Sequence, residues 1–120
     1  MNNLIASALV VAAFVSPAQA QIKLDAEGLA RQQKACISIA LKEGAGNFLE
    51  GYCLAVIVTV MRYESTFNMS CYKTSGANFA AWAAIRKAIV FQALADNKEM
   101  DNITNAFINA SRKLYPCPGK

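Results

Sequence analysis

Four cysteines are the residues of this chain best suited to covalent chemistry, and the chain contains no histidine. Without histidine, neither a Ser-His nor a Cys-His pair is available to activate a nucleophile. A structural zinc site would be expected to show a CxxC pair, and none occurs. An even number of cysteines in a small chain that enters an oxidising compartment is typical of disulfides. We therefore predict two disulfides, no metal site and no cofactor; the cysteines are Cys36, Cys53, Cys71 and Cys117.

Residues 1–20 have the features of a secretory signal peptide. They carry no charged side chain, most of the segment is one apolar run, and it ends in Ala18-Gln19-Ala20, the small-x-small pattern of a cleavage site. The apolar run is too short to cross a bilayer as a helix. We predict cleavage after this triplet, a single mature domain over residues 21–120 and a periplasmic location.

The distribution of the charged side chains argues against a catalytic site and against nucleic-acid binding. The net charge is +4, and the basic residues are dispersed instead of forming a stripe with interleaved aromatics. The eight carboxylates fall at or near the ends of predicted helices, where they cap the helix or oppose its dipole. We expect a protein that is not an enzyme and has no nucleic-acid or membrane partner; an acidic protein face suits this surface better.

Helical periodicity predicts four helices. The first covers residues 26–43. The second covers residues 48–63, and Asn47 with Glu50 forms a capping box at its start. Its β-branched run at residues 56–60 would also suit a buried strand, but the length of the segment favours a buried helix.

The third helix covers residues 79–95 after Asn78, and the fourth follows a capping box of Asp96 and Glu99. Each helix has an apolar side: Leu29, Cys36, Ile37, Ala40 and Leu41 in the first, Phe79, Trp82, Ile85, Ile89 and Ala93 in the third, and Met100, Ile103, Phe107, Ala110 and Leu114 in the fourth. These patterns predict an all-α fold, a small antiparallel four-helix bundle stapled by two disulfides.

The hairpin of the first two helices predicts how the cysteines pair. At ~1.5 Å per residue, Cys36 lies about 10 Å from the end of the first helix and Cys53 about 7 Å from the start of the second. We therefore predict Cys36–Cys53 and Cys71–Cys117. The second bond would tie the chain's end to the loop over residues 64–78, which is long for a connection in a compact domain.

That loop is the predicted partner-binding segment. It groups large apolar side chains with basic ones, a composition typical of protein interfaces, and the residues concerned are Phe67, Met69, Tyr72, Lys73 and, just before the loop, Arg62. The alternative is that these side chains fold back over the bundle around Cys71.

The order Cys36, Gly51-Tyr52-Cys53, Cys71 and Tyr115-Pro116-Cys117 resembles the Rap/Tai family of type VI secretion immunity proteins. The resemblance spans about residues 33–117. It implies a periplasmic homodimer that binds a secreted peptidoglycan amidase in its active-site groove and so protects the producing cell.

Two other classes compete with this interpretation. An HdeA-like periplasmic chaperone is also small, helical and disulfide-bonded, but its acid-triggered unfolding depends on many titrating groups, and eight carboxylates without histidine make a poor switch. A carrier of a small ligand would need an apolar cavity, which the sequence does not test.

Overall fold

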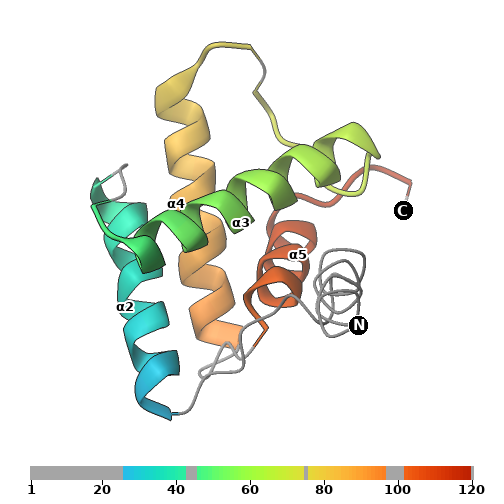
Figure 1. Cartoon of the computed structure of the whole chain (residues 1–120). Coiled ribbons are helices and arrows are strands. Elements are labelled where there is room, and N and C mark those ends of the chain that lie inside the picture. Colours follow the sequence, from blue (N-terminus) through green and yellow to red (C-terminus); the bar gives the residue numbers. More distant parts are fainter. Residues whose placement is uncertain (1–25, 43–45, 75, 97–101, 120) are drawn as a thin grey trace, which may run out of the picture.

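The computed structural model describes residues 26–42, 46–74, 76–96 and 102–119 and contains four α-helices over these ranges (Figure 1). They are α2 (Ala26–Lys42), α3 (Phe48–Thr66), α4 (Phe79–Asp96) and α5 (Ile103–Leu114). The all-α fold is confirmed. The predicted signal peptide lies outside the described residues. Among the helices that are described, none has the length and apolar character needed to cross a membrane.

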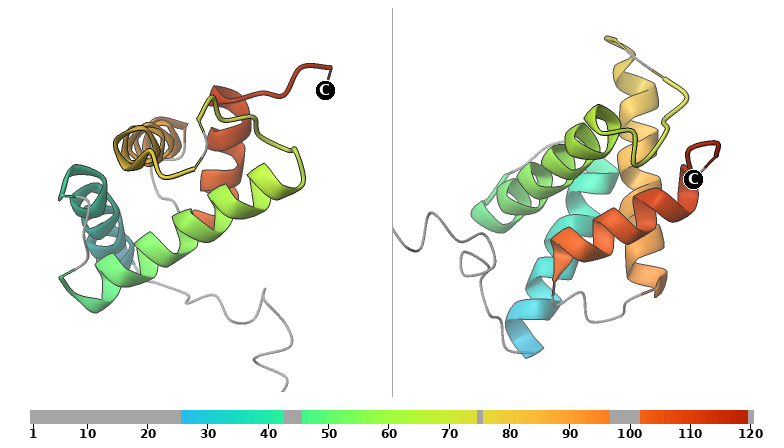
Figure 2. Two further views of the ribbon diagram at one scale, coloured as in Figure 1. Left: turned by 90° about the horizontal axis from the view of Figure 1, so that it is seen from above. Right: turned by 90° about the vertical axis from the view of Figure 1, so that its right-hand side faces the viewer.

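The four helices close into a ring of contacts. Helix α2 packs on α3 and α4, and α5 packs on the same two helices from the other side. In Figure 1, α2 and α4 run alongside each other while α3 crosses them obliquely. Seen from above in Figure 2, α3 reaches from α2 at its start to α5 at its end. Helix α3 therefore spans the molecule from α2 to α5.

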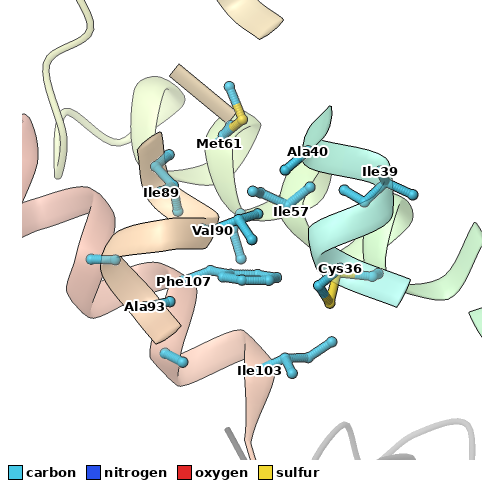
Figure 3. Close-up of a cluster of buried hydrophobic side chains, with 14 of the residues drawn as sticks. Cys36, Ile39, Ala40, Ile57, Met61, Ile89, Val90, Ala93, Ile103 and Phe107 are labelled. Carbon is cyan, nitrogen blue, oxygen red and sulfur yellow. A yellow bond between two sulfur atoms is a disulfide. The ribbon is translucent and has the colours of Figure 1, made fainter. Parts of the chain in front are cut away.

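The core fills the space that this ring encloses (Figure 3). Its largest fully buried apolar side chains come from all four helices and are Ile39, Ile57, Ile89, Val90 and Phe107. The stripe predicted for the fourth helix is therefore confirmed at Ile103, Phe107 and Ala110, which are all buried, whereas Met100 lies outside the described residues.

Two residues expected on buried faces are exposed instead. Leu41 is 60% exposed, because the buried side of α2 is rotated toward Gln32 and Ile39. Phe79 is 80% exposed, because the first turn of α4 extends past α3, as Figure 1 shows. Periodicity fixes which residues share a side of a helix, but the neighbouring helices decide how far that side is covered.

Asparagine side chains cap three of the helices. The Asn47 side chain accepts from the Glu50 backbone N–H at 2.9 Å and donates to its Oε1 at 2.8 Å, which confirms the predicted pair. Asn78 accepts from the N–H of Ala81 at 3.1 Å. At α5 the prediction of Asp96 as the cap is wrong. Asn102 caps this helix, and Asp96 is the last residue of α4.

Both predicted disulfides are present. Cys36 and Cys53 are joined across α2 and α3 with their Cα atoms 5.5 Å apart, and Cys71 is joined to Cys117 with a Cα–Cα distance of 4.9 Å. The first bond lies inside the core, where both cysteines are fully buried. The hairpin register that predicted this pairing is therefore correct.

Helix α3 continues to Thr66 instead of ending at residue 63, so the predicted loop starts too early. The helix ends in a Schellman motif: the N–H of Met69 donates to Glu64 O at 2.9 Å, and the N–H of Asn68 donates to Ser65 O at 3.3 Å. Asn68 adopts a φ of 53°, a left-handed conformation that asparagine tolerates better than most residues.

Candidate functional site

The connection between α3 and α4 is held against the end of the chain. The Cys71–Cys117 disulfide fixes its middle, and the N–H of Cys71 donates to the backbone oxygen of Tyr115 at 2.8 Å. At its far end, the indole N–H of Trp82 donates to Gly76 O at 3.1 Å. One disulfide and two hydrogen bonds therefore hold the described part of this connection in place.

A buried polar cluster supports the same segment from below; it consists of Glu64, Ser70, Tyr72, Ser111 and Arg112. Glu64 is completely buried, and Arg112 pairs with both of its oxygens at 2.8 and 3.1 Å. Ser70 donates to Glu64 Oε1 at 3.0 Å and accepts from Ser111 at 2.9 Å. The Tyr72 hydroxyl lies 2.7 Å from Ser111 Oγ. The cluster therefore joins α3, the loop and α5.

The charge states in this cluster follow from its contacts. The Glu64 carboxylate accepts from Arg112 and raises the pKa of that guanidinium above its ordinary value. Burial raises the pKa of the Tyr72 phenol, although its hydrogen bond to Ser111 acts in the opposite direction. The polar groups of the cluster bind one another, so the cluster serves as a structural support for the connection between α3 and α4. The sequence does not reveal this cluster, because Glu64 lies in the segment that the pattern predicts as a loop.

The five residues predicted to contact a partner separate into two groups. Phe67 is 59% exposed, and Arg62 and Lys73 are also exposed. Met69 and Tyr72 are half-buried. Tyr72 packs against the core, in agreement with the alternative that these side chains fold back over the bundle.

Tyr72 in particular belongs to the framework. Its ring meets Trp82 edge-on at 5.7 Å and Tyr115 edge-on at 5.2 Å, and its hydroxyl is bonded within the polar cluster. Such aromatic pairs contribute about 0.5–1.5 kcal/mol beyond the area they bury. Tyr72 therefore orients the segment that carries Phe67 and Lys73.

An exposed aromatic pair stands next to the loop. Tyr63 is 50% exposed, and its ring centroid lies 4.8 Å from that of Phe67. The two residues are four apart on the last turns of α3, so their side chains meet on one face. Sequence analysis did not assign Tyr63 to the site; the i,i+4 spacing was the signal that could have found it.

A groove of about 510 Å³ opens on the other flank of α3, against the start of α4. Apolar side chains and two arginines form its walls: Val58, Met61, Arg62, Ser65, Thr66, Phe79, Trp82 and Arg86. The Nε atom of Arg86 is shielded from solvent and has no hydrogen-bond partner among the described residues. We call this the α3–α4 groove. Sequence analysis missed it because Phe79 and Trp82 were assigned to the core.

A second hollow of about 500 Å³ lies between α2 and the start of α3. Arg31, Lys34 and the 75%-exposed Phe48 contribute to its walls. Its only acidic wall residue, Glu50, is engaged by Asn47 and by Ser38, whose hydroxyl donates at 2.8 Å.

Within the described ranges, no group of three or more histidine, cysteine, aspartate or glutamate residues could hold a metal ion. The described geometry thus offers an aromatic and basic surface on a firmly held segment, together with a groove lined by arginines. No protein-family model, curated protein or solved structure matches this chain.

Proposed function

We propose that this protein is a periplasmic immunity protein that binds and inhibits a peptidoglycan amidase delivered by a type VI secretion system. The single observation that carries a binding role is the surface beside the Cys71–Cys117 bond, where Tyr63 and Phe67 stand exposed with Lys73 nearby in sequence. The resemblance to the Rap/Tai family supplies the class of partner, the periplasmic location and the homodimeric state.

The way the segment is held supports this proposal. A loop that is already ordered loses less conformational entropy on docking than a free one, so more of its contact energy appears as affinity. The disulfide, the Schellman motif and the polar cluster all order this segment before any partner arrives. A segment that is already ordered is well suited to insertion into an active-site groove.

The residue types support it as well. Aromatic and arginine side chains dominate the energetics of protein interfaces, mainly where they are exposed before binding and buried after it. Phe67, Tyr63 and Arg62 meet this description, since each is exposed in the free protein.

The test measures binding and inhibition with the mature chain and a secreted peptidoglycan amidase, sought first among the products of neighbouring genes. We expect the chain to block the release of peptidoglycan fragments, and to release none when it is assayed alone. Phe67→Ala should weaken binding by about thirtyfold, the effect of losing an interface residue worth ~2 kcal/mol. Calorimetry with alanine variants at Met69, Tyr72, Lys73 and Arg62 maps the rest of the surface.

Phe91→Ala is the matched control, because Phe91 is another exposed phenylalanine, 39% accessible, in the second half of α4 and outside the predicted contact residues. It should bind as the unmodified protein does. If none of the five predicted contact residues changes the affinity by more than twofold on substitution, the loop is not the inhibitory element. Sedimentation of the mature chain tests the homodimer separately.

A further inference from the structure

Every carboxylate in the described part of the chain already has a partner within the protein. Glu27 pairs with Arg31, Glu64 with Arg112 and Asp96 with Lys113, and Glu50 is bound by Asn47 and Ser38. The two arginines of the α3–α4 groove differ from these cations. Neither Arg62 nor Arg86 forms an ion pair with any described residue, and no acidic side chain contributes to the groove walls.

The groove therefore combines two unpaired positive charges with apolar walls. Val58, Met61, Phe79 and Trp82 supply apolar surface, and Phe79 is 80% exposed at the rim. The groove volume of about 510 Å³ falls within the range of ~300–1,000 Å³ typical of binding sites for small ligands. The start of α4 adds the positive end of a helix dipole beside Phe79.

Arg86 is the more informative of the two arginines. Its Nε–H has lost contact with water without gaining an acceptor, and such a donor is costly to leave unpaired. An arginine fork binds a carboxylate through two parallel N–H···O bonds, which lysine does not reproduce. A carboxylate that enters the groove would come close to the unpaired charges of Arg62 and Arg86, since both side chains contribute to its walls.

We propose that the α3–α4 groove binds a segment of a partner protein that carries a glutamate or aspartate flanked by large apolar side chains. The carboxylate pairs with Arg62 and Arg86, and the apolar neighbours cover Phe79 and Trp82. This proposal rests on the proposed function only in that the natural source of the segment would be the amidase; the chemistry of the groove is argued independently of it.

The single tryptophan of the chain makes the groove directly observable. Trp82 is part of the wall, so its fluorescence reports occupancy. The probe is a blocked tetrapeptide, Ala-Leu-Glu-Leu, titrated to millimolar concentration into the mature chain, with Ala-Leu-Gln-Leu as the matched peptide. We expect a saturable change with the glutamate peptide and binding at least about tenfold weaker with the glutamine peptide.

Variants then locate the binding site. Arg62→Gln and Arg86→Gln should each weaken binding of the glutamate peptide about tenfold. Lys87→Gln removes a positive charge from α4, the helix of Arg86, at a position outside the groove walls, and should have no effect. Arg62 is exposed, so its variant stays informative if the half-buried Arg86 variant folds poorly.

Four results would overturn the proposal: no saturable change, equal binding of both peptides, equal binding by the arginine variants and the Lys87 variant, or inorganic phosphate acting as strongly as the peptide. A fluorescence change that depends on protein concentration and disappears in Arg62→Gln would assign the groove to a second copy of the chain and would also overturn it.

The amidase arm separates the two proposals. If the glutamate peptide binds but the amidase is not inhibited, the groove proposal holds and the proposed function fails. If Arg86→Gln and Lys87→Gln inhibit the amidase equally while Phe67→Ala inhibits it more weakly, the proposed function holds and the groove proposal fails.

Discussion

At the hairpin of α2 and α3, Cys36 and Cys53 are fully buried among apolar side chains such as Ile39 and Ile57. At the other end of α3, the Cys71–Cys117 bond lies beside a polar cluster whose centre, Glu64, is a completely buried charge. We call these two regions the hairpin end and the loop end. At the hairpin end, the disulfide reinforces a contact that apolar burial already favours. At the loop end, the covalent bond and the hydrogen bonds replace a core that the loop cannot supply.

This difference supports the proposal that the loop end carries a binding surface. A surface that must expose Tyr63 and Phe67 cannot also bury them, so its rigidity has to come from other interactions. The ion pair of Glu64 with Arg112 and the disulfide provide that rigidity without using the exposed aromatic side chains.

Removing each disulfide tests the comparison with the largest expected effect. By the chain-entropy model, Cys71→Ala with Cys117→Ala, which opens a separation of 46 residues, should lower the free energy of unfolding by about 4 kcal/mol. Cys36→Ala with Cys53→Ala opens 17 residues and should cost about 3 kcal/mol by the same model, plus the loss of buried sulfur from the core.

Denaturant unfolding measures both double variants, and binding to the partner separates them. Only the loop-end variant should lose affinity, measured where both variants remain folded. Equal losses of affinity would show that the two ends do not differ in the way proposed here.

Arg112→Ala tests the ion pair with Glu64. It strips the buried Glu64 carboxylate of its partly exposed charged partner and should lower the free energy of unfolding by about 2 kcal/mol. The control is Lys113→Ala on the next residue. Its ion pair with Asp96 is exposed, so the loss should stay below about 1 kcal/mol. Similar losses in urea unfolding would mean that the polar cluster contributes no more than a surface pair.

Tyr72→Phe tests the hydrogen bond between the Tyr72 hydroxyl and Ser111 in the polar cluster. Losing the bond to Ser111 should cost about 1 kcal/mol near neutral pH. Burial raises the pKa of Tyr72 above its ordinary value of 10.0, so the folded state favours the protonated phenol. That contribution is fully present below pH 10.0 and is lost as the pH rises through the folded-state pKa.

The unmodified protein should therefore lose stability above pH 10.0 more steeply than Tyr72→Phe does. Burial raises the pKa of Tyr115 too, so the variant keeps part of the alkaline slope. Unfolding curves across the alkaline range measure both slopes, and parallel slopes would exclude Tyr72 as their source.

Asp96→Asn should have the smallest effect. Hydrogen bonds from Gln92 and Lys113 lower the pKa of this exposed carboxyl below its ordinary value of 3.8. Its contribution is present above that value and is lost as the pH falls through the lower folded-state pKa. Thermal melts in acid should show a slightly shallower pH dependence for the variant than for the unmodified protein.

Local signals in the sequence predicted much of this architecture. Asparagine caps and apolar spacing located the helices, and the distance of each cysteine from its helix end predicted the hairpin bond. These features depend on residues close together in the chain, or on one simple register between two helices.

The features that were missed depend on distant residues. Glu64 is helical and buried because Arg112, 48 residues further on, reaches its carboxylate. Without that partner in view, a glutamate followed by Ser and Thr resembles the start of a loop. Phe79 has the spacing of a core residue and is exposed because none of the described helices covers the first turn of α4. The α3–α4 groove follows from that same missing cover.

The two covalent rings also follow each other along the chain, and neither encloses the other. Either disulfide can therefore form whether or not the other is already present. Since closure becomes rarer roughly as the 3/2 power of ring length, the ring of separation 17 should form about four times more readily than the ring of separation 46. During oxidative folding, the Cys36–Cys53 bond is thus expected to form before the Cys71–Cys117 bond that holds the loop end.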